Sequence, residues 1–273
     1  MLAIGLYKPW IDILLSGQEP TWLSDKRPET LSVIHVHAKK LNRVGQKLDK
    51  FHEKMRFKSR YTALPLSIVG EIILYPFRSK IPKWRFSDQI CPRDRVIEIQ
   101  IPDAYLSMKW KDLGTFKYFY EETDRDFLVL TTTSSFLNLE NLNSLLQRLP
   151  KTGTYYGPRP YEGANFVSGS FRIFSRDVVL TILENSASMR ATLLEDVALG
   201  QLLNTLGVTP SFFEFTMFST TQEINDAKIK DLESVVHFRL KAGSNENRED
   251  AQLMSLLHQK IHSKVVQSKQ DGS

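Results

Sequence analysis

The sequence has little cysteine, no long apolar run and no strong excess of charge of either sign. Cys91 is the single cysteine among 273 residues, which excludes an intramolecular disulfide and a cysteine-based zinc site and makes a reducing compartment the simpler setting. No stretch of about 18 or more apolar residues occurs, and the first residues lack a basic segment ahead of their apolar part. These absences predict a soluble, cytoplasmic protein without a membrane span or a secretion signal.

The charge balance is only mildly basic. Thirty-six Lys and Arg against 31 Asp and Glu give a net charge of +5. This excess suits ligands that carry phosphate, or peripheral contact with an anionic membrane surface. The basic residues gather at 39–60 and 78–95, among aromatic side chains, and a solvated helix face is the simpler explanation of them. Because no recognisable nucleic-acid motif accompanies them, we expect no nucleic acid partner.

Alternation and helical spacing predict an α/β fold, and a hydrophobic fraction of 41% over this length allows a substantial core. Strands are expected at residues 31–36, 95–101, 126–132, 171–174 and 235–240. Helices are expected near residues 9–16 and at residues 41–57, 108–120, 195–206 and 250–266, with two more that begin after Asn138 and Ser175. Residues 64–77 fit a helix or an extended run, and residues 79–95 fit a long loop.

This order of elements predicts a mostly parallel, doubly wound sheet flanked by helices. Strands alternate with helices, and residues 126–132 form the continuous apolar run expected at the centre of such a sheet. Ligands of these folds bind beyond the carboxyl ends of the strands. We predict three regions: residues 1–30 as an irregular segment packed on the core, residues 31–243 as the α/β domain, and residues 244–273 as a C-terminal helix with a polar tail.

The strongest candidate site lies in residues 161–213. An apolar helical stripe ends at Gly207, a stop signal, and one turn before the stripe stand Glu195 and Asp196, which point the same way. An alternative, equally supported by this stretch alone, is that the two acids are solvated and complement the helix dipole. Before them, Ser168 and Gly169 form a small-residue turn where another group can approach the backbone closely. The stripe consists of Leu199, Leu202, Leu203 and Leu206.

Two strands carry basic side chains two residues apart, and therefore on one face. His37 and His35 are too isolated to indicate a metal site, so we expect them to be partly buried at the sheet end, with a place near a bound nucleotide as the alternative. In the last strand, three potential cations suit an anionic group, although the solvated side of an edge strand would look the same. These are His237, Arg239 and Lys241.

Three blocks in order resemble the β1,3-galactosyl-, N-acetylglucosaminyl- and Fringe-like glycosyltransferases. Residues 96–119 resemble the family's strand, Asp-x-Tyr and lysine-bearing helix, with Asp103, Tyr105 and Lys111 in the matching places. Residues 126–142 resemble the strand that carries the acidic metal motif. Residues 161–213 resemble the glycine turn, the Ser-Arg-Asp-Val helix start and the Glu-Asp-Val motif. Together the blocks cover about half the chain.

The resemblance implies a GT-A fold and an inverting hexosyltransferase of carbohydrate biosynthesis. Such an enzyme moves a sugar from a nucleotide-sugar donor to a saccharide or lipid-linked acceptor. Asp196 matches the family's general base, and Glu195 would orient it or raise its basicity. Ser168 and Gly169 would border the acceptor. On the donor side the expected residues are Lys111, His35, His237, Arg239 and Lys241.

The sequence departs from the family at the metal motif. Where the family has three aspartates, this chain has Thr132, Thr133 and Ser134, whose neutral hydroxyls are poor ligands for manganese or magnesium. We therefore expect an enzyme with weak or no metal dependence, in which the hydroxyls bind ribose or phosphate and the last strand supplies positive charge. One alternative is an inactive GT-A-fold protein that binds a glycan, a nucleotide or a protein. Another is a transferase that recruits Asp124 or Asp126 for a metal.

Overall fold

The computed structural model describes residues 1–6, 11–41, 45–47, 81–87, 93–104, 107–190, 193–243 and 248–270, with side chains as far as residue 262. Several predictions lie outside these ranges. They concern the undecided segment 64–77, Cys91, Tyr105, most of the helix at 41–57 and much of the loop at 79–95. Within those last two segments, residues 45–47 are helical and Trp84–Phe86 form a strand, β3, that the sequence analysis did not predict.

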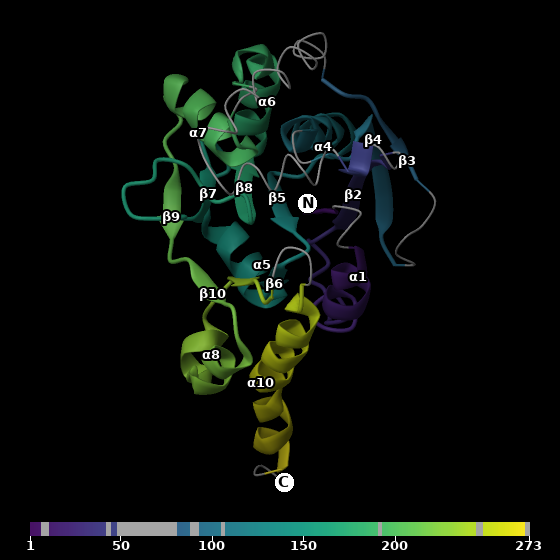
Figure 1. Ribbon diagram of the computed structural model, residues 1–273. Helices are drawn as coiled ribbons and strands as arrows, with labels where there is room; N and C mark the ends of the chain where they lie inside the picture. The colour runs from purple at the N-terminus through teal and green to yellow at the C-terminus, as the bar shows by residue number, and fades with distance from the viewer. Residues whose placement is uncertain are drawn as a thin grey trace.

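Eight strands of the described ranges form one mixed, mostly parallel sheet, in the order β3-β4-β2-β1-β5-β8-β7-β9 (Figure 1). A smaller sheet has the order β10-β11-β6. The strands of the large sheet, besides β3, are β1 Leu2–Gly5, β2 Val33–Lys39, β4 Arg95–Pro102, β5 Phe127–Thr132, β7 Tyr155–Pro158, β8 Phe171–Ser175 and β9 Ser211–Phe213. The smaller sheet contains β6 Ser135–Leu137, β10 Thr216–Phe218 and β11 His237–Leu240.

Strand β1 stands at the centre of the large sheet. It pairs in parallel with β2 on one side and with β5 on the other, so that Ile4 lies opposite both His35 and Thr131. The chain builds outward from β1 through β2 to β4 and then resumes on the other side at β5. The strand order therefore reverses between β1 and β5, which is the position where ligands of open α/β sheets bind.

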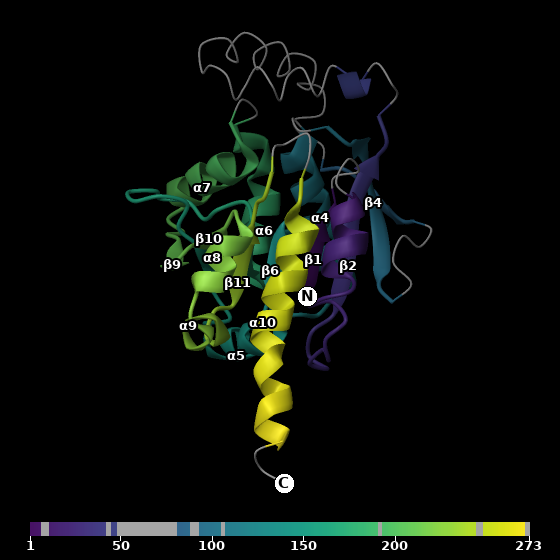
Figure 2. The same ribbon diagram turned by 60° about the horizontal axis from the view of Figure 1, so that its bottom comes forward.

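Helices cover both faces of the sheet. On one face α4 Met108–Glu122, α6 Arg176–Glu184 and α7 Glu195–Thr205 share a core with Ala3, Val36 and Leu130. The opposite face is covered by α1 Ile11–Ile13, the π-helical turn η2 Leu14–Gln18, α5 Leu139–Arg148 and α10 Asp250–Gln270 (Figures 1 and 2). The remaining short helices are η5 Ser186–Ser188, α8 Thr221–Asp226 and α9 Ile229–Glu233.

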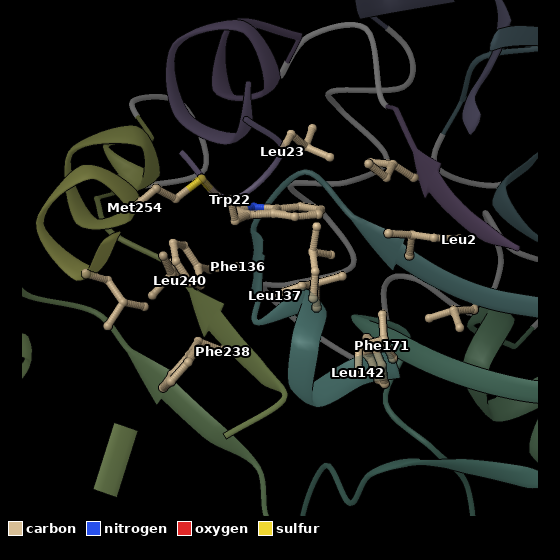
Figure 3. Close-up of a cluster of buried hydrophobic side chains, with 14 of the residues drawn as sticks. Leu2, Trp22, Leu23, Phe136, Leu137, Leu142, Phe171, Phe238, Leu240 and Met254 are labelled. Carbon is tan, nitrogen blue, oxygen red and sulfur yellow. The ribbon is translucent and has the colours of Figure 1, made fainter. Parts of the chain in front are cut away.

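Trp22 joins the N-terminal segment, the small sheet and α10 in one core. Its fully buried ring lies between Met254 of α10 and Leu137 of β6 (Figure 3). Nearby, η2 and α10 approach so closely that a Cβ atom on Gly17 would stand 2.8 Å from Met254 Sδ and 3.1 Å from Ala251 Cα. Glycine suits this position because a side chain would force Met254 to move and would crowd the backbone of α10.

The structure confirms the α/β class and the mostly parallel sheet flanked by helices. The strands predicted at 95–101 and 126–132 and the helix at 108–120 are present as β4, β5 and α4. The prediction that residues 1–30 form an irregular segment is wrong, because Leu2–Gly5 is the central strand. The helices within the described ranges include none with the length and apolar character that crossing a bilayer requires.

Candidate functional site

A small pocket of about 60 Å³ opens where the strand order reverses. Its walls include Gly5 at the carboxyl end of β1, residues 131–133 at the end of β5, and Lys111 of α4. Gly169 and Arg172, from the turn before β8 and from β8 itself, close the other side. The pocket therefore lies beyond the carboxyl ends of the parallel strands, where the sequence analysis expected the ligand.

The carboxylate pair at the start of α7 contacts the glycine turn directly. Asp196 accepts a hydrogen bond through Oδ2 from the backbone N–H of Gly169, at 3.0 Å, and through Oδ1 from the N–H of Val197, at 2.9 Å. A Cβ atom on Gly169 would lie 2.8 Å from Glu195 Oε1 and 3.2 Å from Asp196 Oδ2. Glycine leaves room for both carboxylates at these distances, so the turn and the acidic pair form one unit.

Burial shifts the pKa values of the carboxyl groups in and beside this unit. Burial raises the pKa of Glu195 to about 7, and the neighbouring Asp196 charge acts in the same direction. Arg172 opposes these effects. Its buried guanidinium lies 2.8 Å through Nη2 from Asp112 Oδ2, while Nε and Nη1 have no hydrogen-bond partner in the part of the chain that the structure describes. Burial also raises the pKa of Asp112, against the charge of Arg172.

Hydroxyl groups connect the end of β5 to the same turn. Thr131 Oγ1 and Ser135 Oγ both donate to the carbonyl oxygen of Ser170, each at 3.1 Å. Strand β11 contacts the end of β5 as well, because Arg239 Nη1 donates to Thr132 Oγ1 at 2.8 Å. Gln18 holds the intervening turn through bonds from Nε2 to the carbonyl oxygens of Thr132 and Ser135, at 3.0 and 2.9 Å.

The structure thus brings together the three groups that the sequence analysis selected: the acidic pair, the hydroxyl-rich end of β5 and the last strand. Of the hydroxyl residues, Thr133 and Ser134 are buried and Thr132 is partly exposed. Ser168 bonds its neighbour Ser170 through their hydroxyl oxygens, 3.0 Å apart, and lies with Gly169 beside the carboxylates.

The expectation that His237 supplies positive charge is wrong. The ring is fully buried, stacks on Phe171 with centroids 4.9 Å apart, and lies 3.0 Å through Nε2 from Ser135 Oγ. Burial lowers its pKa to about 3, with a contribution from the charge of Arg239, so the ring is neutral at pH 7. Arg239 is partly buried and Lys241 is exposed. The edge-strand alternative is also wrong, because β11 is the middle strand of its sheet.

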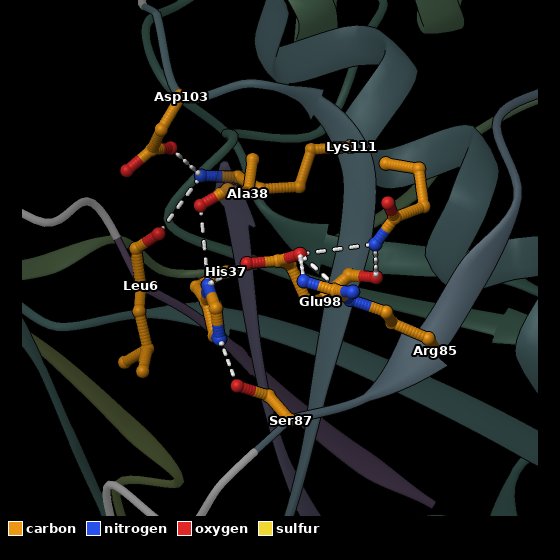
Figure 4. A network of polar contacts seen from close by, with 9 residues as sticks. Leu6, His37, Ala38, Arg85, Ser87, Glu98, Asp103 and Lys111 are labelled. Carbon is orange, nitrogen blue, oxygen red and sulfur yellow. Dashed lines mark hydrogen bonds and ion pairs between the residues drawn. The ribbon is translucent and has the colours of Figure 1, made fainter. Parts of the chain in front are cut away.

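Lys111 lines the pocket but is already engaged. Its Nζ donates to the carbonyl oxygen of Leu6 at 2.9 Å and to Asp103 Oδ1 at 3.2 Å (Figure 4). Two of the three residues that matched the family's first block, Asp103 and Lys111, are therefore an ion pair. A lysine held in this way adds less attraction for a phosphate than a lysine without a counter-ion would.

The two histidines of β2 lie away from the pocket. His35 Nε2 is 3.2 Å from Asp94 Oδ2. Figure 4 shows His37, whose Nε2 is 3.0 Å from Ser87 Oγ. Both rings are fully buried rather than partly buried as expected. Since Val36, on the other face of β2, is the residue of this strand that lines the pocket, the geometry does not support a donor-binding role for His35.

A larger cavity, of about 710 Å³, lies at the amino ends of the parallel strands, opposite the pocket. Met1, Val33 and Arg95 place it at the amino ends of β1, β2 and β4, and Asp124 also lines it. Asp126 pairs there with Lys151 at 2.9 Å. The alternative in which a transferase recruits Asp124 or Asp126 for a metal gains no support from this arrangement, because the two acids precede β5 and Thr132 ends it.

The residues at the end of β5 do not fit the divalent cation that the family resemblance implies. Thr132, Thr133 and Ser134 offer neutral oxygens, whereas hard cations prefer carboxylates. The positive guanidinium of Arg239, bonded to Thr132 Oγ1, would also repel a cation at this position.

No protein-family model matches this chain, and no curated protein is detectably similar to it in sequence. The assignment of the site therefore rests on geometry. Sequence reasoning missed two of its residues, Arg172 and Asp112, which pair between β8 and α4. A signal for Arg172 existed, since it is the one charged residue in the apolar strand Phe171–Ser175.

Proposed function

We propose that this protein is an inverting, metal-independent glycosyltransferase of the GT-A type, which uses a nucleotide-sugar donor and a saccharide or lipid-linked acceptor. One observation carries the proposal. The acidic pair of α7 and the hydroxyl-rich end of β5 both contact the turn at residues 168–170, and Arg239 of β11 contacts Thr132 at that strand end, beside the pocket at the strand reversal. The mostly parallel sheet with helices on both faces is compatible with that fold.

The acidic pair would supply the general base. In an inverting transfer the acceptor oxygen forms a bond to the anomeric carbon, its proton moves to a carboxylate, and the sugar–phosphate bond breaks to release the nucleoside diphosphate. The family resemblance favours Asp196 as this base. The structure adds a reason to test Glu195, because a carboxyl group with a pKa of about 7 accepts a proton readily near neutral pH, whereas both Asp196 oxygens already accept backbone hydrogen bonds.

Positive charge for the leaving group would come from arginine. Arg172 presents two buried nitrogens without a hydrogen-bond partner in the described ranges and lines the pocket. Arg239 reaches the hydroxyl of Thr132 at the end of β5. Guanidinium groups bind phosphate oxygens through two donors at once and stabilise the charge that develops on the diphosphate. This arrangement supports transfer without a metal at that position.

A donor screen would test the proposal. Sugar transfer and donor hydrolysis are measured over common nucleotide sugars, with and without EDTA, and activity that survives EDTA is expected. Asp196→Asn and Glu195→Gln should each lower turnover by at least about a hundredfold with little change in donor affinity, as expected for loss of a general base. Glu184→Gln, at an exposed glutamate of α6, is the matched control and should retain full activity.

Nucleotide binding separates transfer from the alternative function. Uridine and guanosine diphosphates are titrated by calorimetry with and without manganese. Binding that is weakened by Arg239→Ala together with Lys241→Ala would support a donor site. Absence of binding under every condition, with no transfer, would contradict the transferase proposal and favour an inactive GT-A-fold protein that binds a glycan or a protein partner.

A further inference from the structure

A cluster of metal-ligand side chains outside the pocket lies between the N-terminal segment and α10. Asp25 follows the turn after η2, and His258 and His262 are four residues apart on α10, so both rings leave the same side of the helix. His258 Nε2 is 3.0 Å from Asp25 Oδ1, and His262 Nε2 is 3.6 Å from Asp25 Oδ2. Figure 2 shows α10 beside the N-terminal helical turn.

The spacing of these atoms matches a tetrahedral metal site. Ligands about 2.0–2.1 Å from a zinc ion in tetrahedral geometry stand about 3.4 Å from one another. The two separations, 3.0 Å to Asp25 Oδ1 and 3.6 Å to Asp25 Oδ2, lie on either side of that value, and one ligand atom from each residue lies within 4.8 Å of the other two. A metal ion could therefore be bound after adjustment of the side chains, without rearrangement of the backbone elements that carry them.

The hydrogen bond of His262 sets the ring for metal binding. Its Nδ1 lies 3.0 Å from the carbonyl oxygen of His258, and a carbonyl oxygen can only accept, so Nδ1 carries the proton. Nε2 then has a free lone pair directed at the cluster. Metal-binding histidines are commonly oriented in this way by a carbonyl bonded to the other ring nitrogen. The ring of His258 is held by packing, with its centroid 6.2 Å from that of Phe136 and 4.2 Å from that of His262.

The cluster is also reachable from solvent. The side chain of His262 is 45% exposed, and those of His258 and Asp25 are 22% and 29% exposed. Three protein ligands on a partly exposed surface leave a fourth position for water, as in zinc sites with three protein ligands.

A second group of similar residues, Glu19, His35 and Asp94, is a poorer candidate. Arg27 donates to both oxygens of Asp94, and its positive charge occupies the place of a cation. This group therefore provides a control rather than a site.

We propose that Asp25, His258 and His262 bind Zn²⁺ or a transition-metal ion with similar ligand preference. Two imidazole nitrogens and one carboxylate are ligands that zinc accepts and that magnesium and calcium do not favour. The ion would join α10 to the N-terminal segment, in addition to the contact of Gly17 with Met254. The proposal does not depend on the transferase function, because the cluster lies on α10 and after η2 rather than at the pocket.

Calorimetric titration of the full-length, untagged protein, after removal of metal with EDTA and dialysis, provides the test. We expect one Zn²⁺ per chain, no binding of Mg²⁺, a higher melting temperature with Zn²⁺, and visible absorption bands when Co²⁺ takes the place of Zn²⁺. Asp25→Asn and His262→Asn should each weaken Zn²⁺ binding by at least about tenfold, as changes around metal sites commonly do. His262→Asn is the more informative variant. The side chain of His262 is the most exposed of the three, so its replacement should disturb the fold least.

Glu19→Gln is the matched control, because it alters the other group of ligands and should leave Zn²⁺ binding unchanged. Absence of stoichiometric binding by the wild-type protein would overturn the proposal. So would equal Zn²⁺ affinity in the wild type, Asp25→Asn and His262→Asn, which would show adventitious binding at other residues. Loss of binding in Glu19→Gln alone would place the ion in the second group instead.

Discussion

Replacement of Glu195 by glutamine tests the electrostatics of the acidic pair without any assumption about substrate. The carboxyl pKa is raised from 4.5 to about 7. A raised carboxyl pKa means that the folded protein holds this proton more tightly than the unfolded chain does. The resulting stability is fully present below the unfolded pKa of 4.5 and is lost as the pH rises through about 7. Glutamine is uncharged throughout and has no such dependence.

The expected size follows from that rise. At 1.36 kcal/mol for each tenfold change in proton affinity, the rise corresponds to at most about 3 kcal/mol. Glu195 is partly exposed, so solvent screening lowers the expected value to about 1–2 kcal/mol. Relative to the wild type, Glu195→Gln should therefore become more stable by about 1–2 kcal/mol between about pH 4 and about pH 8.

Urea unfolding of both proteins across this pH range measures the difference, and titrating groups that do not interact with Glu195 cancel in the comparison. Glu184→Gln, an exposed glutamate on α6, should run parallel to the wild type. Asp196→Asn should instead lose about 1–3 kcal/mol at neutral and alkaline pH, because an amide oxygen replaces only one of the two acceptors that bond Gly169 and Val197. If the curves of Glu195→Gln and the wild type stay parallel from acid to alkaline pH, the reasoning about Glu195 is refuted.

Two further predictions concern packing and buried charge. Gly200→Ala in α7 would place a Cβ 2.2 Å from Phe166 Cβ. We therefore expect the free energy of unfolding in urea to fall by about 1–3 kcal/mol, despite the better helix propensity of alanine. An unchanged unfolding midpoint would contradict this. Arg27→Met would leave buried Asp94 without its bidentate partner and should lower the free energy of unfolding by about 3 kcal/mol at pH 7. Arg27→Lys, which keeps the positive charge, should recover part of this loss. Equal stability of the methionine variant and the wild type would show that the pair contributes nothing.

The sequence predicted the elements that carry a long, regular pattern. Residues 95–101 alternate cleanly and form β4, and residues 126–132 are a continuous apolar run that forms β5. Strands of three residues, such as β6, β9 and β10, are too short to show any period, and they were missed. Their positions are decided by tertiary pairing, which a single sequence does not reveal.

The central strand was missed for a related reason. Leu2–Gly5 is an apolar run of four residues followed closely by Pro9, and a proline at this distance is typical of irregular structure. A strand buried on both faces has no alternation between polar and apolar residues, so periodicity cannot identify it. Its parallel pairing with β2 and β5 involves residues more than thirty positions away.

The acidic pair and the glycine turn were predictable because both are local patterns, a helical stripe and a small-residue turn. The ion pair of Arg172 with Asp112 joins β8 to α4, and no local pattern contains both residues. The neutral state of His237 was likewise beyond sequence reasoning. Its two-residue spacing from Arg239 predicts a shared face, but the burial that lowers its pKa comes from Phe171 and Ser135, on other strands.

The region around residues 168–170 carries a free-energy cost that the stability of the fold does not require. Arg172 buries two guanidinium nitrogens without a partner in the described ranges, and the pKa of Glu195 is raised beside it. Each feature costs the folded state of the order of a kilocalorie per mole or more, and packing alone would favour apolar residues here. Such costs, gathered where the strand order reverses, are expected at a site that meets an anionic ligand, whose oxygens would satisfy the donors of Arg172 and whose binding would recover part of the lost stability.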